Sequence, residues 1–327
     1  TVSPEDFDGD GDMDVFIGSR SVVGIYGVNP DHLLLENTGN GEFRNATERV
    51  ANDLKDAGMV TAAAWADLDG DGKKDLIVTT DWGSPKVYRN NGRRISKLNT
   101  SLDSLHGWWN TVTTADLDKD GDQDLILGNQ GSNLHYKPSP GQPMKMWVND
   151  FDNNGTLEQI VTLSENGRDY PIHMKKELTG QLVSLKKENL KASVYARRTI
   201  QELLPQEVVA KSIVKKATLS ESVVAINEGN GKFSIRKLPE RVQLSCICGI
   251  ACMDVNKDGH LDLVMAGNNY EFKPQFSRLD AGYGNVLLGD GKLNFEWQDY
   301  GKSGFFVRGE VKHLQTLRDK NGKTYLI

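Results

Sequence analysis

The feature that most constrains this chain is a nine-residue acidic segment that occurs five times. The copies begin at residues 6, 67, 116, 150 and 254. Each copy has oxygen-bearing side chains at positions 1, 3, 5 and 9, glycine at position 6 and an apolar residue at position 2; residues 6–14, for example, read DFDGDGDMD. An apolar, strand-like run follows every copy. Self-similarity of this kind is typical of repeat architectures.

The spacing within each copy predicts a calcium-binding loop. Ca²⁺ takes about six to eight oxygen ligands, and alternate side chains of a tight loop can turn inward to provide them. Glycine at position 6 permits the sharp turn, and the backbone carbonyl of position 7 then faces the ion. We therefore expect about five structural Ca²⁺. The expected ligands are Asp6, Asp8, Asp10, Asp12 and Asp14; Asp67, Asp69, Asp71, Lys73 and Asp75; Asp116, Asp118, Asp120, Asp122 and Asp124; Asp150, Asp152, Asn154, Thr156 and Glu158; and Asp254, Asn256, Asp258, His260 and Asp262.

Two of these loops are expected to bind more weakly, and none is an EF-hand. Asn154 and Glu158 replace aspartates in the fourth copy, and Asn256 replaces one in the fifth, so those copies carry fewer or less favourable charges. An EF-hand requires glutamate at position 12 and helices on both sides. Position 12 is apolar in all five copies, and the flanks are rich in β-forming residues. Each loop is therefore expected to join two strands.

A second repeated element predicts β-hairpins. Residues 33–43 read LLLENTGNGEF, and residues 87–92, 223–233 and 286–295 repeat the same order of a strand, a Gly/Asn turn and, in three of the four copies, an aromatic residue. A unit thus consists of strand A, calcium loop, strand B, connection, strand C, turn and strand D. Repeated units of four antiparallel strands predict an all-β chain folded as a β-propeller.

The spacing of the loops leaves the number of blades between five and six, with the last one incomplete. The third and fourth loops begin only 34 residues apart, too few for a full blade. Either the fourth loop lies in the C–D hairpin of the third blade, or one blade has lost strands. Residues 305–327 resemble strands A and B of a further blade, so we expect the natural protein to continue past Ile327. The whole of 1–327 is expected to form one domain.

Residues about 165–220 interrupt the β pattern and predict a small helical insertion. The apolar spacing of 195–204 (YARRTIQELL) favours a helix, and Pro205 can open another over PQEVVAKSIV. Residues 164–220 hold 11 Lys and Arg against 6 Asp and Glu. This charge suits either an anionic ligand or an ordinary solvated helical surface. We expect the insertion to cap one face of the propeller.

The repeated DxDxDGxxD loop followed by an apolar run, together with the NxGxGxF turn, resembles the FG-GAP/VCBS repeat family. Its members include integrin α-subunit propellers, cartilage-acidic-protein-like proteins and many secreted or lipid-anchored proteins of Bacteroidetes-type bacteria. The resemblance covers nearly all of the chain except residues about 165–220. It implies a calcium-stabilised propeller with an interaction role, and it does not specify the ligand.

The long connections on the face away from the calcium loops are the expected ligand-binding surface. In an up-and-down blade, the A–B loops lie on one face, and the B–C and D–A connections lie on the other. Aromatic residues gather on the latter, which suits stacking on a carbohydrate or contact with a protein, although such rings also pack into propeller cores. The candidates are Trp82, His106, Trp108, Trp109, His135, Tyr136, Tyr270, Phe276 and Arg278.

Charge, cysteine content and hydropathy bear on where in or outside the cell this protein functions. The five loops hold 20 of the 45 acidic residues and 4 of the 39 basic ones, so the rest of the chain is net positive. Cys246 and Cys248 are only two positions apart on one expected strand, a poor geometry for a disulfide, and these two cysteines and Cys252 are expected to be buried. No apolar stretch is long enough to span a membrane, and we expect no signal peptide within 1–327. Weak calcium loops function where calcium is abundant, which favours an extracellular or cell-surface location, at the outer membrane of a bacterium if the resemblance holds.

Two functions compete at this stage. The first is a non-catalytic binding module for an extracellular glycan or protein, as part of a larger multidomain surface protein or complex. The alternative is a calcium-containing propeller enzyme such as a polysaccharide lyase, which needs a base and a cation near the substrate carboxylate. The candidate groups for catalysis, including His173 and Lys137, form no motif. Nucleic-acid binding lacks a recognisable signature, so we expect the non-catalytic module.

Overall fold

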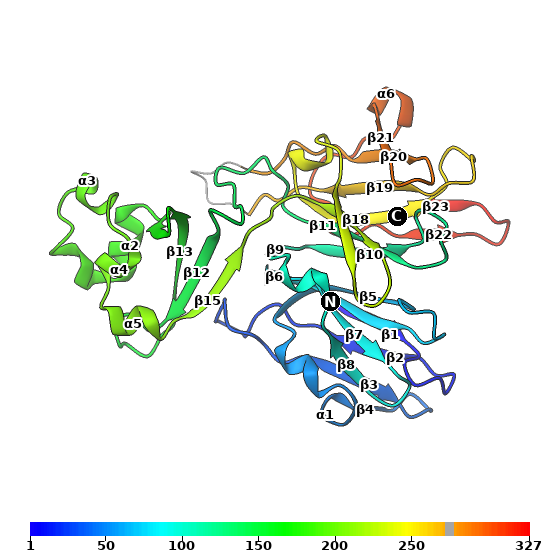
Figure 1. Cartoon of the computed structure of the whole chain (residues 1–327), viewed down its shortest axis with the longest axis horizontal. Coiled ribbons are helices and arrows are strands. Elements are labelled where there is room, and N and C mark those ends of the chain that lie inside the picture. Colours follow the sequence, from blue (N-terminus) through cyan, green and yellow to red (C-terminus); the bar gives the residue numbers. More distant parts are fainter. Residues whose placement is uncertain (272–277) are drawn as a thin grey trace.

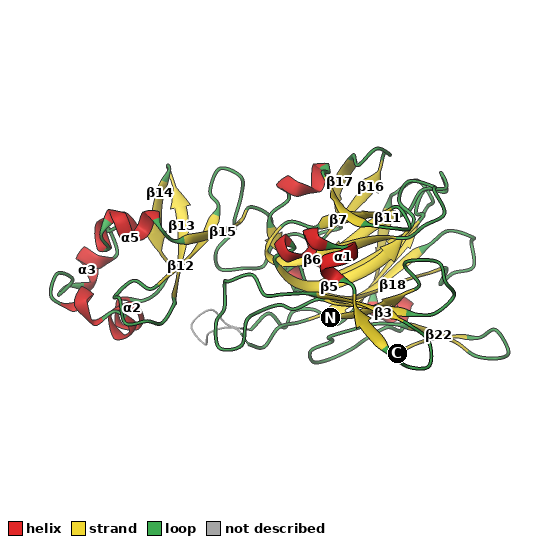
Figure 2. Ribbon diagram, turned by 90° about the horizontal axis from the view of Figure 1, so that it is seen from below, coloured by secondary structure: helices red, strands yellow, loops and turns green. Residues whose placement is uncertain are grey.

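The computed structural model describes residues 1–271 and 278–327 (Figures 1 and 2). The chain is mostly β, as the repeats predict, and its principal elements are four-stranded antiparallel sheets. The helices are short and lie in the connections and in one inserted segment. Within the described ranges, no helix has the length and apolar character needed to cross a membrane.

The first two sheets follow the strand order expected for the repeat. Each runs in chain order, with every strand antiparallel to the next. In the second sheet, a short additional strand, β9, pairs with the end of β6. The first sheet contains β1 (Val2–Glu5), β2 (Asp14–Ile17), β3 (Leu33–Asn37) and β4 (Phe43–Asn45); the second contains β5 (Met59–Ala66), β6 (Asp75–Gly83), β7 (Lys86–Asn90), β8 (Ile95–Leu98) and β9 (Gly107–Trp108).

Two further sheets have the same plan, but a long insertion divides one of them. The third sheet is β10 (Thr111–Ala115), β11 (Asp124–Gly128), β16 (Val223–Asn227) and β17 (Phe233–Lys237). The fourth is β18 (Ile247–Met253), β19 (Asp262–Gly267), β20 (Asn285–Gly289) and β21 (Phe295–Gln298). The C-terminal residues add a two-stranded hairpin of β22 (Thr316–Arg318) and β23 (Thr324–Leu326), where the sequence indicated two strands.

These four sheets place the two repeated motifs as predicted. An acidic loop joins the first and second strand of each sheet, and a Gly-containing turn joins the third and fourth. The first strands of successive sheets contact one another, so that β1 lies against β5, β5 against β10 and β10 against β18. The sheets therefore pack face against face in chain order, from the sheet of β1–β4 to the sheet of β18–β21 (Figure 1).

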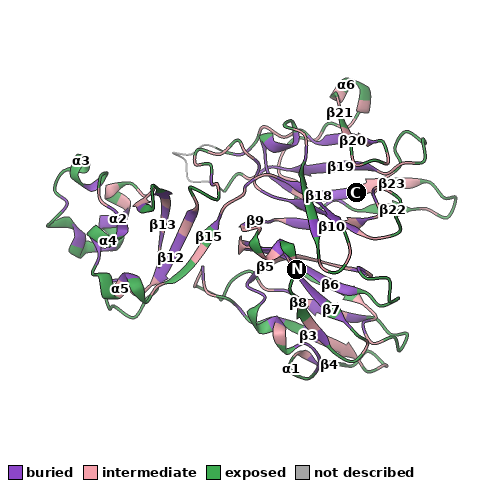
Figure 3. Ribbon diagram, in the orientation of Figure 1, coloured by how far each residue is buried: buried purple, intermediate pink, exposed green. Residues whose placement is uncertain are grey.

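The core lies between neighbouring sheets. Strands β11, β16 and β19 are buried at every position because each has a sheet or connection on both faces. Figure 3 shows β19 in the colour of buried residues. One cluster, with Phe16 and Tyr88, joins the first and second sheets; another, with Ile77 and Leu125, joins the second and third; a third, with Ile126 and Met265, joins the third and fourth. Each buried Leu or Ile contributes about 1.5–3 kcal/mol of transfer free energy.

The insertion is larger than the sequence indicated and contains the fourth acidic loop. It occupies the connection between β11 and β16, and it projects to the left of the four sheets in Figure 1. It has its own sheet in the order β14-β13-β12-β15. The fourth loop therefore lies neither in the C–D hairpin of the third sheet nor in a shortened blade. The strands are β12 (Met144–Asn149), β13 (Glu158–Glu165), β14 (Arg168–Pro171) and β15 (Ile213–Ala217).

Short helices lie within residues about 165–220, as the sequence predicted, and they cover one side of this inserted sheet. The expectation that they cap a face of the four sheets is wrong for the described residues, because their apolar side chains pack against the inserted sheet instead. Trp147 and Ile160 of the sheet pack against Leu178, Tyr195 and Leu203 of the helical segment. The predicted helix over 195–204 is divided between two single turns, and the helix after Pro205 ends where β15 begins. The helical elements are α2 (Lys175–Gln181), η3 (Val183–Lys186), α3 (Ala192–Tyr195), α4 (Ile200–Leu203) and α5 (Gln206–Ala210).

The remaining helices are single turns within connections of the four sheets. They are α1 (Thr47–Val50), η1 (Asn52–Asp56), η2 (Ser101–Ser104), η4 (Val242–Leu244) and α6 (Tyr300–Ser303). Cys248 and Cys252 lie on β18, Cys246 directly precedes it, and all three are free. Cys248 and Cys252 are half-buried rather than buried as expected. The Sγ atoms of Cys246 and Cys248 are 3.6 Å apart across an irregularity in the strand, and Cys246 is buried as expected.

Candidate functional site

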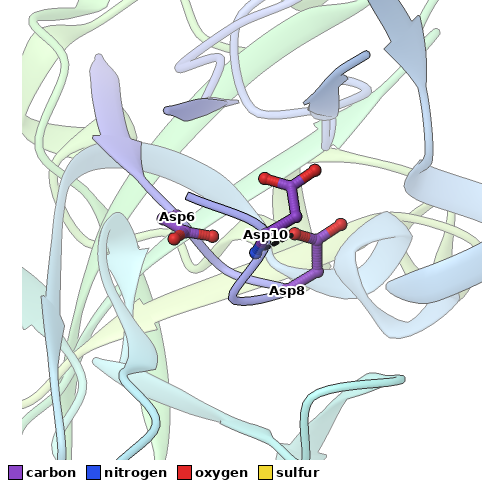
Figure 4. A group of neighbouring side chains, drawn as sticks. All are labelled: Asp6, Asp8 and Asp10. Atoms are coloured by element: carbon purple, nitrogen blue, oxygen red, sulfur yellow. Dashed lines mark hydrogen bonds between the residues drawn. The ribbon is translucent and has the colours of Figure 1, made fainter. Parts of the chain in front are cut away.

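The acidic loops bring carboxylates together in four of the five copies. In the first three loops, oxygens from positions 1, 3 and 5 lie within 4.8 Å of one another, as Figure 4 shows for Asp6, Asp8 and Asp10. In the fourth loop, the group consists of Asp150, Asp152 and Glu158. Several carboxylates this close repel one another unless a cation lies between them. The donor set, hard anionic oxygens in a short loop, fits Ca²⁺.

Backbone N–H groups hold the first carboxylate of each loop in place. Asp6 accepts hydrogen bonds from the N–H of Gly9 at 2.8 Å and of Gly11 at 3.0 Å. Asp67 accepts equivalent bonds from Gly70 and Gly72, each at 2.8 Å. Gly11 has a φ of 95°, in the left-handed region that favours glycine. The loops therefore have their turn conformation fixed by the chain itself.

The carboxylate at position 9 joins the loop to the rest of its sheet. Asp124 accepts a bond from the N–H of Leu117 in the loop at 3.1 Å and another from the N–H of Asn227 on the third strand at 2.9 Å. The first and fourth sheets make the same pair of bonds, with Asp14 and Asp262 respectively. All these carboxylates are buried. Position 9 is therefore both a candidate metal ligand and a structural link.

Burial changes the acidity of these linking carboxylates. Desolvation raises the pKa of Asp75 and of Asp124 to about 6, despite the hydrogen bonds that favour their ionised forms. The same cause raises the pKa of Asp14. A carboxylate in such surroundings is costly to ionise without a neighbouring positive charge. A divalent cation in the loop would supply that charge.

The asparagine of the hairpin motif connects neighbouring sheets. The side-chain Nδ2 of Asn90, at the end of β7, donates to the carbonyl of Phe7 in the first loop at 2.8 Å. Asn227, at the same place in β16, donates to the carbonyl of Leu68 in the second loop at 3.0 Å. Each side chain also accepts a bond from the glycine two residues later, which forms the turn. The motif therefore couples a turn, an acidic loop and the next sheet.

The fifth loop differs as its sequence suggested. Asn256 donates from Nδ2 to Asp258 at 2.8 Å, and its Oδ1 accepts from the N–H of Asp258 at 3.0 Å. Asp254 retains the contact with the glycine N–H at 2.9 Å. The loop keeps its shape with one carboxylate fewer at positions 1, 3 and 5. We expect this loop to be weaker than the first three.

A cavity of about 390 Å³ lies at the other end of the sheets. It is lined by the end of β6, by the connections that follow the second strand of the other three sheets, by β9 and by the inserted segment. We call it the aromatic cavity. Its aromatic and ionisable lining residues are Arg20, Tyr26, Asp81, Trp82, Trp108, His135, Tyr136, His173 and Glu271.

The polar part of the aromatic cavity centres on Asp81, which is buried. Arg20 donates to Asp81 from Nε at 3.1 Å and from Nη2 at 2.7 Å, and the hydroxyl of Tyr26 donates to the same carboxylate. The Arg20 side chain is 60% exposed, so it also faces solvent. Desolvation and the Asp81 charge raise the pKa of Tyr26 far above its usual value. Asp81 therefore acts as an anchor that holds both side chains in place.

Trp82 and Trp108 form the apolar part of this cavity. Their rings are edge to face, with centroids 5.2 Å apart. Trp82 has a φ of 55°, in the left-handed region that a bulky residue rarely adopts. Pairing of Asp81 with Trp108 and of Gly83 with Gly107 holds the chain in that conformation. Strained residues of this kind are concentrated at ligand-binding sites.

The structure places the nine residues that the sequence suggested for ligand binding in different parts of the molecule. Trp82, Trp108, His135 and Tyr136 line the aromatic cavity, and His106 lines a neighbouring one. Trp109 must be corrected: its ring is fully buried among the second and third sheets, and its Nε1 donates to the carbonyl of Leu105. Tyr270 and Arg278 stack on each other, with the guanidinium 5.2 Å from the ring centroid. Phe276 lies outside the described residues.

Sequence reasoning missed the polar residues of the cavity. Arg20 and Asp81 are 61 positions apart, and nothing in their local sequence pairs them. Gln130 and Glu271 were likewise not selected, whereas His173 was named only as a candidate catalytic group. Arg20 lies three residues after β2, and Asp81 lies near the end of β6. Both are at the loop-rich ends of apolar second strands, and that position is the signal that could have identified them.

Comparison with known protein families identifies FG-GAP-like repeats at residues 6–78 and 67–127. These matches run from the first acidic loop, after β1, through the second sheet and into β11 of the third, and they include the first three acidic loops. This part of the chain is therefore made of FG-GAP-like repeats, and the class is a repeat protein of β-sheets. A search of curated proteins finds no significant match.

Proposed function

We propose that this protein is a non-catalytic, extracellular or cell-surface binding module that holds a glycan in the aromatic cavity. The observation that supports this most is the composition of the cavity. The second sheet supplies two tryptophans, and segments of the other sheets place polar groups beside them in fixed positions. A concave site of a few hundred Å³ with aromatic walls suits a saccharide better than a flat protein surface. FG-GAP-like repeats are typical of extracellular binding modules.

We further propose that the four sheets are blades of a β-propeller. Successive first strands lie side by side, as they do around a propeller axis. The hairpin of β22 and β23 would belong to a further blade. The aromatic cavity would then lie at one face and the acidic loops at the other.

The acidic loops would bind about five Ca²⁺ as structural ions. Asp6, Asp8 and Asp10, with their counterparts in the other loops, would provide the carboxylate ligands. The bound ion would supply the positive charge that allows the linking carboxylate at position 9 to ionise while buried. Loops of this kind bind Ca²⁺ weakly in extracellular proteins, which supports the proposed location.

The engagement of the cavity's ionisable groups supports binding rather than catalysis. The Tyr26 hydroxyl donates a hydrogen bond to Asp81. Its raised pKa disfavours the phenolate form that Tyr26 would need to act as a base. The Nε2 of His173 accepts a bond from the N–H of Val161 at 3.0 Å. Asp81 is paired with Arg20. These groups are held in structural contacts. They are therefore poorly suited to acid–base catalysis and well suited to holding a ligand in a fixed position.

The test combines a calcium measurement with glycan binding. We expect thermal unfolding to shift upward with excess Ca²⁺ relative to chelator, since a ligand that binds only the folded state stabilises it. We expect Trp108→Ala to lose at least tenfold in affinity for glycans retained on an array, because aromatic hot spots cost about 1.4 kcal/mol or more. The matched control is Tyr325→Ala, which removes an exposed ring on β23.

Three outcomes would contradict the proposal. Equal unfolding temperatures in Ca²⁺ and chelator would refute the calcium sites. Glycan binding that Trp108→Ala leaves unchanged would refute the cavity as the site. Reproducible cleavage of an acidic polysaccharide, seen as new unsaturated ends, would replace the binding module with the lyase alternative.

A further inference from the structure

A second cavity, of about 450 Å³, adjoins the aromatic cavity. The two share Asp81 and Trp82 in their walls, so Trp82 stands between them. The second cavity lies between the turn after β6, the start of β7 and strand β15 of the inserted segment. We call it the lysine cavity, after Lys86, Lys145, Lys215 and Lys216 in its lining.

The charge in the lysine cavity is strongly unbalanced. Besides the four lysines, His106 also lines it, and its one carboxylate is that of Asp81. Asp81 is already engaged by Arg20 and Tyr26. Lys145 is paired with Asp169 at 2.9 Å. Among the described residues, no carboxylate forms an ion pair with Lys86, Lys215 or Lys216.

Two of these ammonium groups are held by neutral oxygens. Lys86 Nζ donates to the carbonyl of Ala57 at 2.9 Å, and Lys215 Nζ donates to Oδ1 of Asn29 at 2.6 Å. Burial lowers the pKa of Lys86 to about 8, with a further contribution from the neighbouring Lys97 and Lys215 charges. Burial also lowers the pKa of Lys215. These cations have lost part of their hydration without gaining an anionic partner.

An anion bound in the lysine cavity would give these ammonium groups the negatively charged partner that they lack. It would offset the repulsion between Lys86 and Lys215. A charged hydrogen bond in a partly desolvated site is also stronger than one at an open surface. The neighbouring Trp82 and Trp108 offer ring surfaces at the boundary of the same site. A chain of acidic sugars has an apolar ring face and an anionic group on each unit, which matches aromatic and basic surfaces placed side by side. An acidic peptide matches only the basic part.

We propose that the lysine cavity binds the carboxylate or sulfate groups of an acidic polysaccharide whose sugar rings occupy the aromatic cavity. This inference rests on the proposed function and specifies its ligand. Lys215 and Lys216 contact the anionic groups, and Lys86 positions them. The inserted segment, which supplies β15, is thus part of the binding site.

The test measures the affinity of the full chain, in Ca²⁺, for defined polymers. The probes are polygalacturonate for carboxylates, dextran sulfate for sulfates, dextran as the neutral polysaccharide and poly-L-glutamate as the acidic peptide. We expect one of the two acidic polysaccharides to bind at least tenfold more tightly than dextran and poly-L-glutamate. Binding should weaken with salt, because the contacts are partly electrostatic.

Lys215→Gln/Lys216→Gln is the informative variant. We expect it to reduce affinity for the acidic polysaccharide about tenfold or more, since charged hydrogen bonds contribute about 1.5–3 kcal/mol each. The matched control is Lys186→Gln/Lys187→Gln, which removes the same charge from η3 and its C-terminal end. The control should bind as the unchanged protein does, and circular dichroism should show both variants folded.

The outcomes separate this inference from the proposed function. If neutral glycans bind in a Trp108-dependent way while the Lys215→Gln/Lys216→Gln variant binds normally, the anionic site is wrong and the glycan module stands. If both lysine variants lose equal affinity, the attraction is a general charge effect and the lysine cavity is refuted. Equal or tighter binding of poly-L-glutamate would replace the polysaccharide with a peptide. If no polymer and no arrayed glycan binds, both proposals fail.

Discussion

Trp82 shows how one residue can carry both strain and a binding surface. Its φ of 55° places a large side chain in a conformation that costs a residue other than glycine about 1–2 kcal/mol. The pairing of β6 with β9 holds the chain there and sets the ring against Trp108. The same ring borders both cavities. The strain is therefore tolerated at a position where the ring lines both cavities.

The strain at Trp82 can be measured by comparing two variants. Trp82→Ala and Trp82→Gly both remove the ring, but only glycine adopts positive φ without steric cost. We expect Trp82→Gly to be about 1 kcal/mol more stable than Trp82→Ala in urea unfolding at saturating Ca²⁺. Equal stabilities, or a more stable alanine variant, would show that the conformation is not strained.

His32 is a buried histidine that makes stability depend on pH. Its Nδ1 accepts a hydrogen bond from the N–H of Ser19 at 3.1 Å, which requires that nitrogen to be unprotonated. Burial lowers the pKa of His32 below its usual 6.5. Because the folded-state pKa is the lower one, the unfolded chain takes up the proton first as pH falls. The stabilising contribution is therefore complete above about pH 6.5 and is lost progressively below it.

We expect the free energy of unfolding to decrease as pH falls from 7 towards 5, with part of that slope due to His32. His32→Asn keeps a short acceptor for the Ser19 N–H and has no titrating ring, so its slope over this range should be shallower. Both proteins are measured by urea unfolding with Ca²⁺ held at saturation. Identical slopes would mean that His32 titrates alike in the folded and unfolded chain.

At the scale of the element, the acidic loop and the hairpin turn act together. The position-9 carboxylate receives the N–H of the third strand, as Asp124 does from Asn227. The Asn227 side chain then reaches the acidic loop of the preceding sheet at Leu68. Asn37 occupies the same place in the first sheet, where no sheet precedes it among the described residues, and it donates only to Met13 of its own loop. This pair of asparagines isolates the bond between sheets.

The bond between sheets is tested by two matched substitutions. Asn227→Ala and Asn37→Ala both remove a bond to the turn glycine and a bond to the residue's own loop. Only Asn227→Ala also leaves the buried Leu68 carbonyl without its partner. We expect Asn227→Ala to destabilise the protein by about 1–3 kcal/mol more than Asn37→Ala, measured by chemical unfolding. A similar loss in both would show that the contact between sheets contributes little.

At the scale of the whole molecule, the proposed metal sites and the cavities lie at opposite ends of the same strands. Strand β6 begins at Asp75, in the second acidic loop, and ends at Trp82 and Gly83, beside both cavities. At the end with the acidic loops, the position-9 carboxylates join strands within a sheet, and the asparagines join neighbouring sheets. The cavity end is built from connections that these sheets position. Calcium is thus expected to stabilise the scaffold without contacting the ligand.

The placement of the proposed metal sites and the cavities at opposite ends of the strands predicts that calcium removal changes hydrogen exchange at one end only. Removal of Ca²⁺ at a temperature where the protein stays folded should speed exchange of the N–H groups bonded to position-9 carboxylates: those of Asn37, Asn90, Asn227 and Gly289. The N–H of Trp108, bonded to Asn129 at the cavity end, should change little. Equal acceleration at both ends would indicate that calcium controls global unfolding or the cavity itself.

The local patterns were sufficient to predict the units of this protein. The acidic loops, the hairpins after the third strands and the four-stranded antiparallel plan all follow from residues close together in sequence, because turn chemistry and side-chain alternation are local properties. The helical character of residues near 175–210 was readable for the same reason, although the limits of its helices were not.

The tertiary structure decided what those units form together. It placed the fourth acidic loop in a separate inserted sheet, and it assigned Trp109 to the core and its neighbour Trp108 to the aromatic cavity. It joined Arg20 to Asp81 and Asn227 to Leu68, which are 61 and 159 positions apart. Such pairs depend on which faces of the sheets meet, and packing between distant segments leaves no periodic signal in either one.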